Sequence, residues 1–248
     1  MFEKILLDAE KKDYLFRILF VTLAITVILA FFNSFIGANS LFLVALISLA
    51  LAYPVITYIR EMDIEELEKS METKLLILRH EKEMAVFWAI FVGLVIGFYI
   101  ATPLISDFTY QEAFKNKISG NLTQTNLFFT QILLNNLEVN LMTFIISFLA
   151  FSGLIFVLVW NASIVSYHLY SLSSHKLALL QGIIFLSHGL IEIGGYILAG
   201  IAGSILALKI DRKTKFNHSL NKEFFKDLSI LIFTSILLIF IGAGIESL

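Results

Sequence analysis

The chain has 248 residues, of which 58% are hydrophobic and only 15% are charged, with a formal net charge of −2. Soluble domains carry about 25% charged residues, so this composition is typical of a membrane protein, and the lack of any concentrated basic face argues against nucleic acid as a partner. The absence of cysteine excludes a disulfide framework, a thiolate nucleophile and a cysteine metal site.

Three charged segments divide the chain, at residues 1–17, 60–83 and 209–227. Each is rich in Lys and Arg, and such segments face the cytoplasm in multi-pass membrane proteins. We therefore expect a cytoplasmic interfacial helix at 1–17, a cytoplasmic, charged helical connector at 60–83 and a cytoplasmic basic loop at 209–227. The N-terminus is then cytoplasmic and the C-terminus lies outside.

The apolar stretches between these segments are long enough to cross a bilayer as helices. In one of them Gly93 and Gly97 lie one turn apart, which predicts close packing against another helix. Residues 127–140 are amphipathic and are expected at the membrane interface or as half of a broken helix. Plain spans are predicted at residues 15–32, 41–59, 84–105, 141–160 and 228–245.

The number of crossings between residues 106–126, expected outside, and residues 209–227, expected inside, must be odd. Two long apolar blocks lie there, at 127–160 and 177–208. One of them therefore folds back as a hairpin or contains an additional crossing. The charge count leaves both blocks open. We expect residues 161–176 to be cytoplasmic, which places the break in the second block.

These segments predict an all-α polytopic membrane protein that forms a single integral membrane domain over residues 1–248, with the lipid bilayer as its surroundings. About five to six transmembrane helices are expected, together with a re-entrant or broken helical segment and amphipathic interface helices. Broken helices at membrane depth often form the binding sites of transporters, so the position of the break bears on function.

The block at 177–208 holds two ionisable side chains at membrane depth, His188 and Glu192. They are four residues apart and share a helix face with Tyr196. Ionisable groups at this depth are costly and mark candidate functional sites. His188 and Glu192 can hydrogen-bond each other, or Glu192 can bond to asparagine amides from elsewhere. The candidate partners are Asn135, Asn136, Asn140, Asn161, His168 and His175.

Small residues form a second stripe beside this polar face and predict close helix packing. They are Gly189, Gly195, Ala199 and Gly203. The polar face then serves as a proton or ion relay, a metal site, an acid–base pair, or a structural clamp that holds a helix break together. Two metal-type ligands without a third predict no metal and no cofactor. No hydrolase, nucleotide or zinc-protease motif occurs, so we predict no catalytic residues and no enzyme.

Two blocks of the sequence resemble the stage II sporulation protein M family of multi-pass membrane proteins. One is NNLEVN at residues 135–140 with the apolar run that ends at WNA, residues 160–162, similar to the family's NN…NG arrangement around a span. The other is SHGLIEIGGYILAGIAG at residues 187–203, similar to the family's PHGIIEL-type segment, with Ser187 where the family typically has proline. Together they mark residues 127–208 as a family-like core.

The resemblance implies a membrane protein of cell-envelope processes. In spore formers the sporulation member is associated with membrane and wall remodelling, and partner proteins perform the wall chemistry, whereas the wider family has no agreed biochemical activity. We therefore expect a non-enzymatic scaffold or partner-recruiting component of the cell membrane, a homo-oligomer with a dimer favoured, with envelope proteins as partners. The alternative is a transporter or channel for a proton, ion or small polar solute. An intramembrane enzyme ranks third.

Overall fold

The computed structural model describes residues 13–69, 80–105, 125–150, 153–172, 178–216 and 222–247. Within these residues every regular element is a helix, and seven helices are long and apolar enough to cross a membrane. The prediction of an all-α polytopic membrane protein is confirmed. The elements are α2 (Tyr14–Ile36), α3 (Ser40–Lys69), α5 (Glu81–Ala101), the 3-10 turn η1 (Thr102–Leu104), α7 (Thr125–Ala150), α8 (Gly153–Leu172), α9 (Ala178–Phe216) and α10 (Lys222–Glu246).

The outer surface of the helix bundle carries large apolar side chains. Phe35 is 85% exposed, and Leu49, Leu149 and Phe233 are nearly as accessible. On a soluble protein such a surface would be an aggregation liability, but lipid chains solvate it without cost. The exposed surface is therefore the lipid-facing surface.

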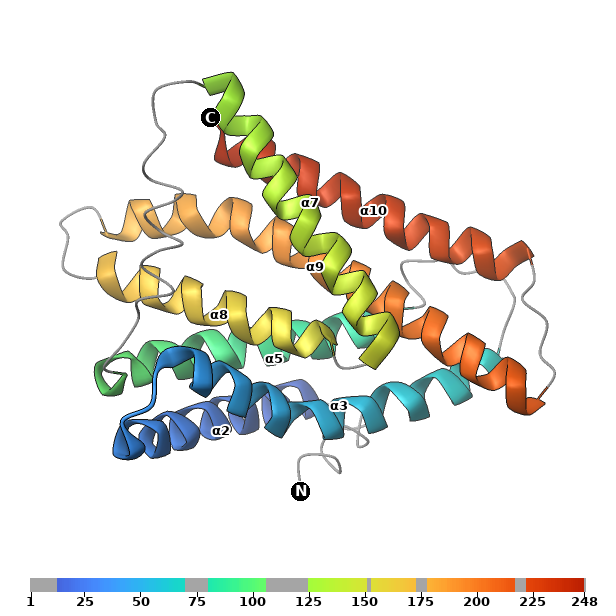
Figure 1. Ribbon diagram of the computed structural model, residues 1–248, viewed down its shortest axis with the longest axis horizontal. Helices are drawn as coiled ribbons and strands as arrows, with labels where there is room; N and C mark the ends of the chain where they lie inside the picture. The colour runs from blue at the N-terminus through green and yellow to red at the C-terminus, as the bar shows by residue number, and fades with distance from the viewer. Residues whose placement is uncertain are drawn as a thin grey trace.

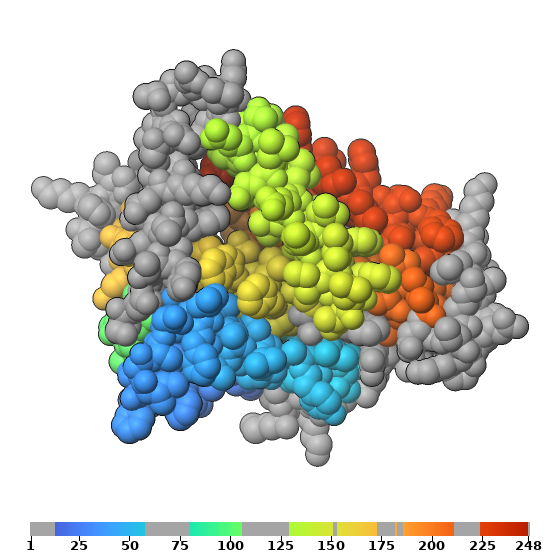
Figure 2. All heavy atoms as spheres, viewed as in Figure 1, coloured from blue at the N-terminus to red at the C-terminus, as the bar shows by residue number. Residues whose placement is uncertain are grey.

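The helix α9 lies at the centre of the C-terminal half, where it packs against α7, α8 and α10. The helix α8 also contacts α5 and α3, and α5 packs along α2. Figure 1 shows α7 slanting across α9, while α8 and α9 run more nearly along the long axis. In the same view α7 forms much of the molecular face, between α3 and α10 (Figure 2).

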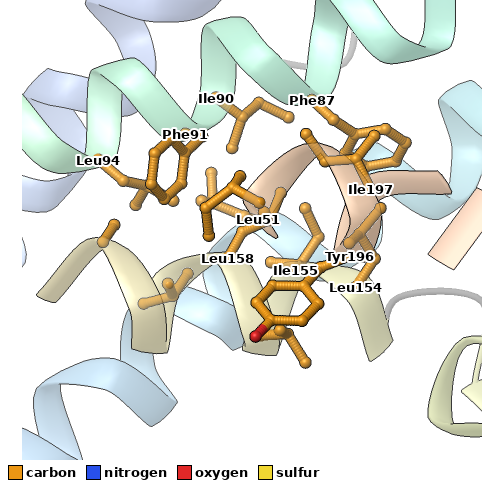
Figure 3. Close-up of a cluster of buried hydrophobic side chains, with 14 of the residues drawn as sticks. Leu51, Phe87, Ile90, Phe91, Leu94, Leu154, Ile155, Leu158, Tyr196 and Ile197 are labelled. Carbon is orange, nitrogen blue, oxygen red and sulfur yellow. The ribbon is translucent and has the colours of Figure 1, made fainter. Parts of the chain in front are cut away.

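The apolar core lies where α5, α8 and α9 meet beside α3. Among the polar groups there, the hydroxyl of Ser166 on α8 is shared between two carbonyl oxygens, that of Val95 on α5 at 2.8 Å and that of Ala162 in its own helix at 2.6 Å. The core side chains labelled in Figure 3 are Leu51, Phe87, Ile90, Phe91, Leu94, Leu154, Ile155, Leu158, Tyr196 and Ile197.

Two glycines of α5 allow it to lie directly against α2. A Cβ atom built at Gly93 would lie 2.6 Å from the carbonyl oxygen of Leu19, and one at Gly97 would lie 2.7 Å from Cβ of Thr26. Real Cβ atoms do not approach other atoms so closely. The spacing of these glycines therefore serves helix packing, as their sequence pattern predicted.

The C-terminal half contains the additional candidate crossing that the charge count allowed as one of two alternatives. The helix α7 continues without a break from Thr125 to Ala150, and α8 begins at Gly153. The block at 127–160 therefore holds the additional crossing, and the second block forms the single long helix α9. Seven candidate spans in the described residues replace the five to six spans with a broken segment that were expected.

Close packing at the start of α8 explains the corner between α7 and α8. A Cβ atom built at Gly153 would lie 2.5 Å from the carbonyl carbon of Ile146 on α7, so only glycine permits the approach. The prediction of one span at 141–160 is wrong because two helices share these residues. Residues 127–140 are not half of a broken helix, because they belong to the continuous α7. Residues 161–172, expected as part of a loop, complete α8.

The charged segments are more helical than expected. The helix α3 continues past its apolar part to Lys69, α9 continues to Phe216, and α10 begins at Lys222, so the loop predicted at 209–227 is wrong for most of its length. Lys, Arg and Glu are good helix formers, so a helix can continue beyond the apolar part of a span. The portions of the predicted 1–17 and 60–83 segments outside the described residues are 1–12 and 70–79.

Candidate functional site

One face of α7 is polar and yet buried inside the bundle. Asn136, Asn140, Thr143 and Ser147 are all buried, and their spacings of four, three and four residues put them in one stripe. Leu141, by contrast, is well exposed. A helix in a bilayer turns its apolar side to lipid and its polar side to protein. The buried polar stripe therefore identifies the face on which α7 meets its neighbours.

The carboxylate of Glu192 on α9 meets this stripe. Glu192 is 9% exposed, and its Oε1 accepts a hydrogen bond of 2.6 Å from Nδ2 of Asn136 on α7. Asn135 donates in turn to Oδ1 of Asn136, at 3.3 Å. An amide donor offsets part of the cost of burying a carboxylate. Of the two arrangements that the sequence allowed for Glu192, the structure contains the bond to an asparagine amide.

A second polar contact lies one helical turn further along α7. The hydroxyl of Ser235 on α10 donates to Oδ1 of Asn140 on α7 and to the carbonyl oxygen of Gly195 on α9, both at 2.9 Å. A hydroxyl carries one proton, so the two acceptors share it. Three helices are thus joined by polar contacts. We call Asn136, Asn140, Glu192, Gly195 and Ser235 the polar junction.

Glycines on α10 and α9 create the space that the polar junction needs. A Cβ atom at Gly242 on α10 would lie 2.5 Å from Cγ and 3.1 Å from Oε1 of Glu192. A Cβ atom at Gly195 would lie 3.0 Å from the carbonyl oxygen of Ser235. The close approach of these backbones is the packing mode of small residues in membrane helices.

The predicted packing residues divide into two groups. Gly195 faces α10, Gly203 faces the backbone of α7 near Phe144, and Ala199 is buried. Gly189 is different, because a Cβ atom there would meet no atom within 4 Å among the described residues. Among the described residues Gly189 makes no close helix contact, and its packing role stays a prediction.

The remaining predicted site residues lie apart or serve other contacts. His188 is buried one turn before Glu192. Tyr196 belongs to the apolar core, because a four-residue spacing drifts around the helix (Figure 3). Asn161 donates to the carbonyl oxygen of Val157 in its own helix, at 2.8 Å, a bond that does not reach the polar junction. His175 lies outside the described residues.

The sequence interpretation missed the contribution of α10. Ser235 and Gly242 are seven residues apart in an otherwise apolar span, so they lie on one face of the helix. A small or polar pair at this spacing is itself a signal for close helix packing. Chemically, the junction offers one carboxylate with amide, hydroxyl and carbonyl oxygens. Across the described residues no group of three or more His, Cys, Asp or Glu could hold a metal.

A family model described as "Stage II sporulation protein M" matches residues 84–248, which include all of the polar junction and the four helices of the C-terminal half. No curated protein matches the chain. No solved structure matches it either.

Proposed function

Since this chain belongs to the stage II sporulation protein M family, we propose that it is a non-enzymatic membrane component of the cell envelope that holds or recruits envelope proteins. The observation that supports a scaffold is the polar junction. Its groups bond to one another across three helices, Asn136 to Glu192 and Ser235 to Asn140. Polar groups used in this way stabilise a helix assembly, which is the main need of a scaffold.

We infer a location in the cell membrane, with the N-terminus cytoplasmic and the C-terminus outside. The Lys-rich and Arg-rich segments support this orientation, and seven candidate spans lead to opposite sides for the two ends. Because α7 and α8 are two separate candidate spans, the end of α8 then lies outside the cell. This is opposite to the cytoplasmic side first expected for residues 161–176.

The proposal also includes a homodimer that works with other envelope proteins. Size-exclusion chromatography with light scattering, on protein in lipid nanodiscs, measures the stoichiometry. A monomer at all protein concentrations would contradict the dimer while leaving the scaffold proposal in place.

The scaffold is tested by replacing Glu192→Gln and His188→Gln separately. Folded yield is measured after purification, and proton and solute flux are measured in vesicles, with the exposed Glu138→Gln on α7 as control. A scaffold predicts a lower folded yield for Glu192→Gln and no flux in the natural protein. Unchanged assembly together with a flux that the substitution abolishes would overturn it.

The second candidate function is a transporter or channel for a proton, an ion or a small polar solute. The observation that favours it is the depth of Glu192, six residues inside the candidate span Leu186–Ile210. At 1.5 Å per residue this is about 9 Å along the helix from the start of the span. A carboxylate at this depth is a frequent feature of ion pathways.

A further inference from the structure

No lysine or arginine lies along the helices around Glu192 to neutralise its charge, and the basic side chain that precedes it by one turn on α9 is the buried His188. No Lys or Arg occurs in residues 127–175, 177–208 or 227–248, which contain the candidate spans of α7 and α8 and nearly all of those of α9 and α10. A second carboxyl group lies nearby in the fold, because Glu246 follows Gly242 by one turn of α10 and Gly242 packs against Glu192. A buried carboxyl group in this setting either carries a proton or pairs with a positive ion.

Three neutral oxygen atoms meet at Ser235, about one helical turn along α9 and α7 from the hydrogen-bonded pair of Glu192 and Asn136. Oδ1 of Asn140 and the carbonyl oxygen of Gly195 both lie 2.9 Å from Oγ of Ser235, with a single hydroxyl proton among the three atoms. Gly195 follows Glu192 by three residues on α9. Asn140 follows Asn136, the hydrogen-bond partner of Glu192, by one turn of α7. Carboxylate, amide, hydroxyl and backbone oxygens are the ligands of hard cations.

We propose that the polar junction binds one small monovalent metal cation, Na⁺, between the carboxylate of Glu192 and the oxygens of Asn140, Ser235 and Gly195. One carboxylate and one monovalent ion cancel in charge, which removes most of the cost of burying either. A hydroxyl can rotate about its C–O bond, so Ser235 can turn its proton away and present a lone pair to the ion.

The access route follows from the position of Glu246. This residue is the last of α10 and is partly exposed, whereas Gly242, one turn earlier, packs against Glu192. A cation entering at the end of α10 therefore meets one carboxylate at the surface and a second one turn inside. This inference rests on the second candidate function, because it names the ion that a transporter or channel would handle. It requires that the ion binds, but not that it is transported.

A proton on Glu192 is the competing occupant, and the two ions differ in what they need. A bound proton requires only the carboxylate. A metal cation also requires the neutral oxygens, so the removal of one of them weakens its binding. Ser235→Ala therefore lowers Na⁺ affinity by about tenfold or more, whereas a proton on Glu192 is little affected.

The first experiment measures the thermal unfolding midpoint of the purified full-length protein in lipid nanodiscs. Sodium chloride is compared with choline chloride at constant pH and ionic strength. We expect a saturable increase of the midpoint in Na⁺ for the natural protein and for Glu138→Gln. The increase needs higher Na⁺ concentrations in Ser235→Ala and is absent in Glu192→Gln. The exposed Ser229→Ala, whose hydroxyl bonds within α10, serves as the matched control.

The second readout is carbodiimide labelling of Glu192, followed by mass spectrometry. A hydrophobic carbodiimide adds to a protonated carboxyl group and rearranges to a stable N-acylurea, with no leaving group. Bound Na⁺ excludes the proton, so labelling slows as Na⁺ rises at fixed pH. Both readouts use the natural protein, so they do not depend on whether a variant folds.

Two results would overturn the cation site. One is that the natural protein has the same unfolding midpoint in Na⁺ and in choline and that the labelling rate of Glu192 does not change with Na⁺ concentration. Glu192 would then carry only a proton. The other is a Na⁺ effect that persists in a folded Glu192→Gln protein. The scaffold proposal is judged by assembly and flux, so either result leaves it unaffected.

Discussion

Gly242 on α10 leaves open the space that the side chain of Glu192 on α9 fills. The position where a Cβ atom of residue 242 would stand is 2.5 Å from Cγ of Glu192. The same carboxylate accepts the hydrogen bond from Asn136 on α7. The packing of α10 on α9 and the polar contact of α9 with α7 therefore depend on one side chain.

Gly242→Ala should destabilise the protein, because the added methyl group must displace Glu192 and disturb its bond to Asn136. Overpacking of this kind costs about 1–3 kcal/mol in free energy of unfolding. Gly244→Ala is the matched control, since a Cβ atom there meets nothing within 4 Å. Denaturant unfolding in detergent micelles measures both. Equal stability of the two variants would contradict the coupling.

Ser235→Ala should lower the free energy of unfolding by about 0.5–2 kcal/mol, because it removes the contacts of α10 with Asn140 and Gly195. Ser229→Ala removes a hydroxyl from the same helix that bonds only to the carbonyl of Phe225 at an exposed position. The control should stay within about 0.5 kcal/mol of the natural protein. A larger loss in the control than in Ser235→Ala would argue against the polar junction.

Gly203→Ala should separate α9 from α7, because the new Cβ atom collides with the backbone around Phe144 and Phe148. Backbone cannot rotate away as a side chain can, so we expect a loss of about 1–3 kcal/mol or more. Gly189→Ala, on the same helix but with no described atom near its Cβ position, should have little effect. Thermal unfolding of the two variants side by side decides the point.

Asn136 and Glu192 should be energetically coupled. A double-mutant cycle with Asn136→Ala and Glu192→Ala should give an interaction energy of about 0.5–2 kcal/mol, the range of hydrogen bonds between membrane helices. A parallel cycle of Glu138→Ala with Glu192→Ala should be additive, because Glu138 lies on the exposed face of α7. Additivity in the first cycle would remove the bond as a stabilising contact.

Single cysteines in this cysteine-free chain test the topology. Asn39→Cys, at the turn between α2 and α3, and Leu172→Cys, at the end of α8, should react with an impermeant thiol reagent from outside. Asp13→Cys, at the start of α2, should react only after permeabilisation. A cytoplasmic Leu172→Cys would mean that the corner between α7 and α8 does not join two full crossings.

The helical membrane fold could be predicted from the sequence because apolar runs and charged loops alternate along the chain. The corner before α8 was missed because its residues are as apolar as a span. A local signal exists in Ser152-Gly153, a dipeptide typical of turns. This dipeptide alone does not show that the chain turns here. The turn depends on the tight fit of Gly153 against Ile146, which is a tertiary contact that a local sequence pattern cannot predict.

The residues of the polar junction were predicted in part. Glu192, Asn136 and Asn140 stood out because polar groups at membrane depth are rare. The sequence could not tell which asparagine reaches Glu192, since that depends on the crossing of α7 over α9. Asn161 was equally plausible by residue type, but it bonds within α8. Ser235 was overlooked because serine is common in membrane helices, where its hydroxyl can bond to its own backbone.

The separation of 56 residues between Asn136 and Glu192 also sets an order of events during synthesis. The amides of α7 leave the ribosome before the carboxylate of α9 exists, and the whole of α8 is made in between. At about 5–20 residues per second this interval lasts on the order of 3–11 s. Throughout it, α7 has a polar face without its final partners, so the insertion machinery must keep this helix out of free lipid until α9 and α10 arrive.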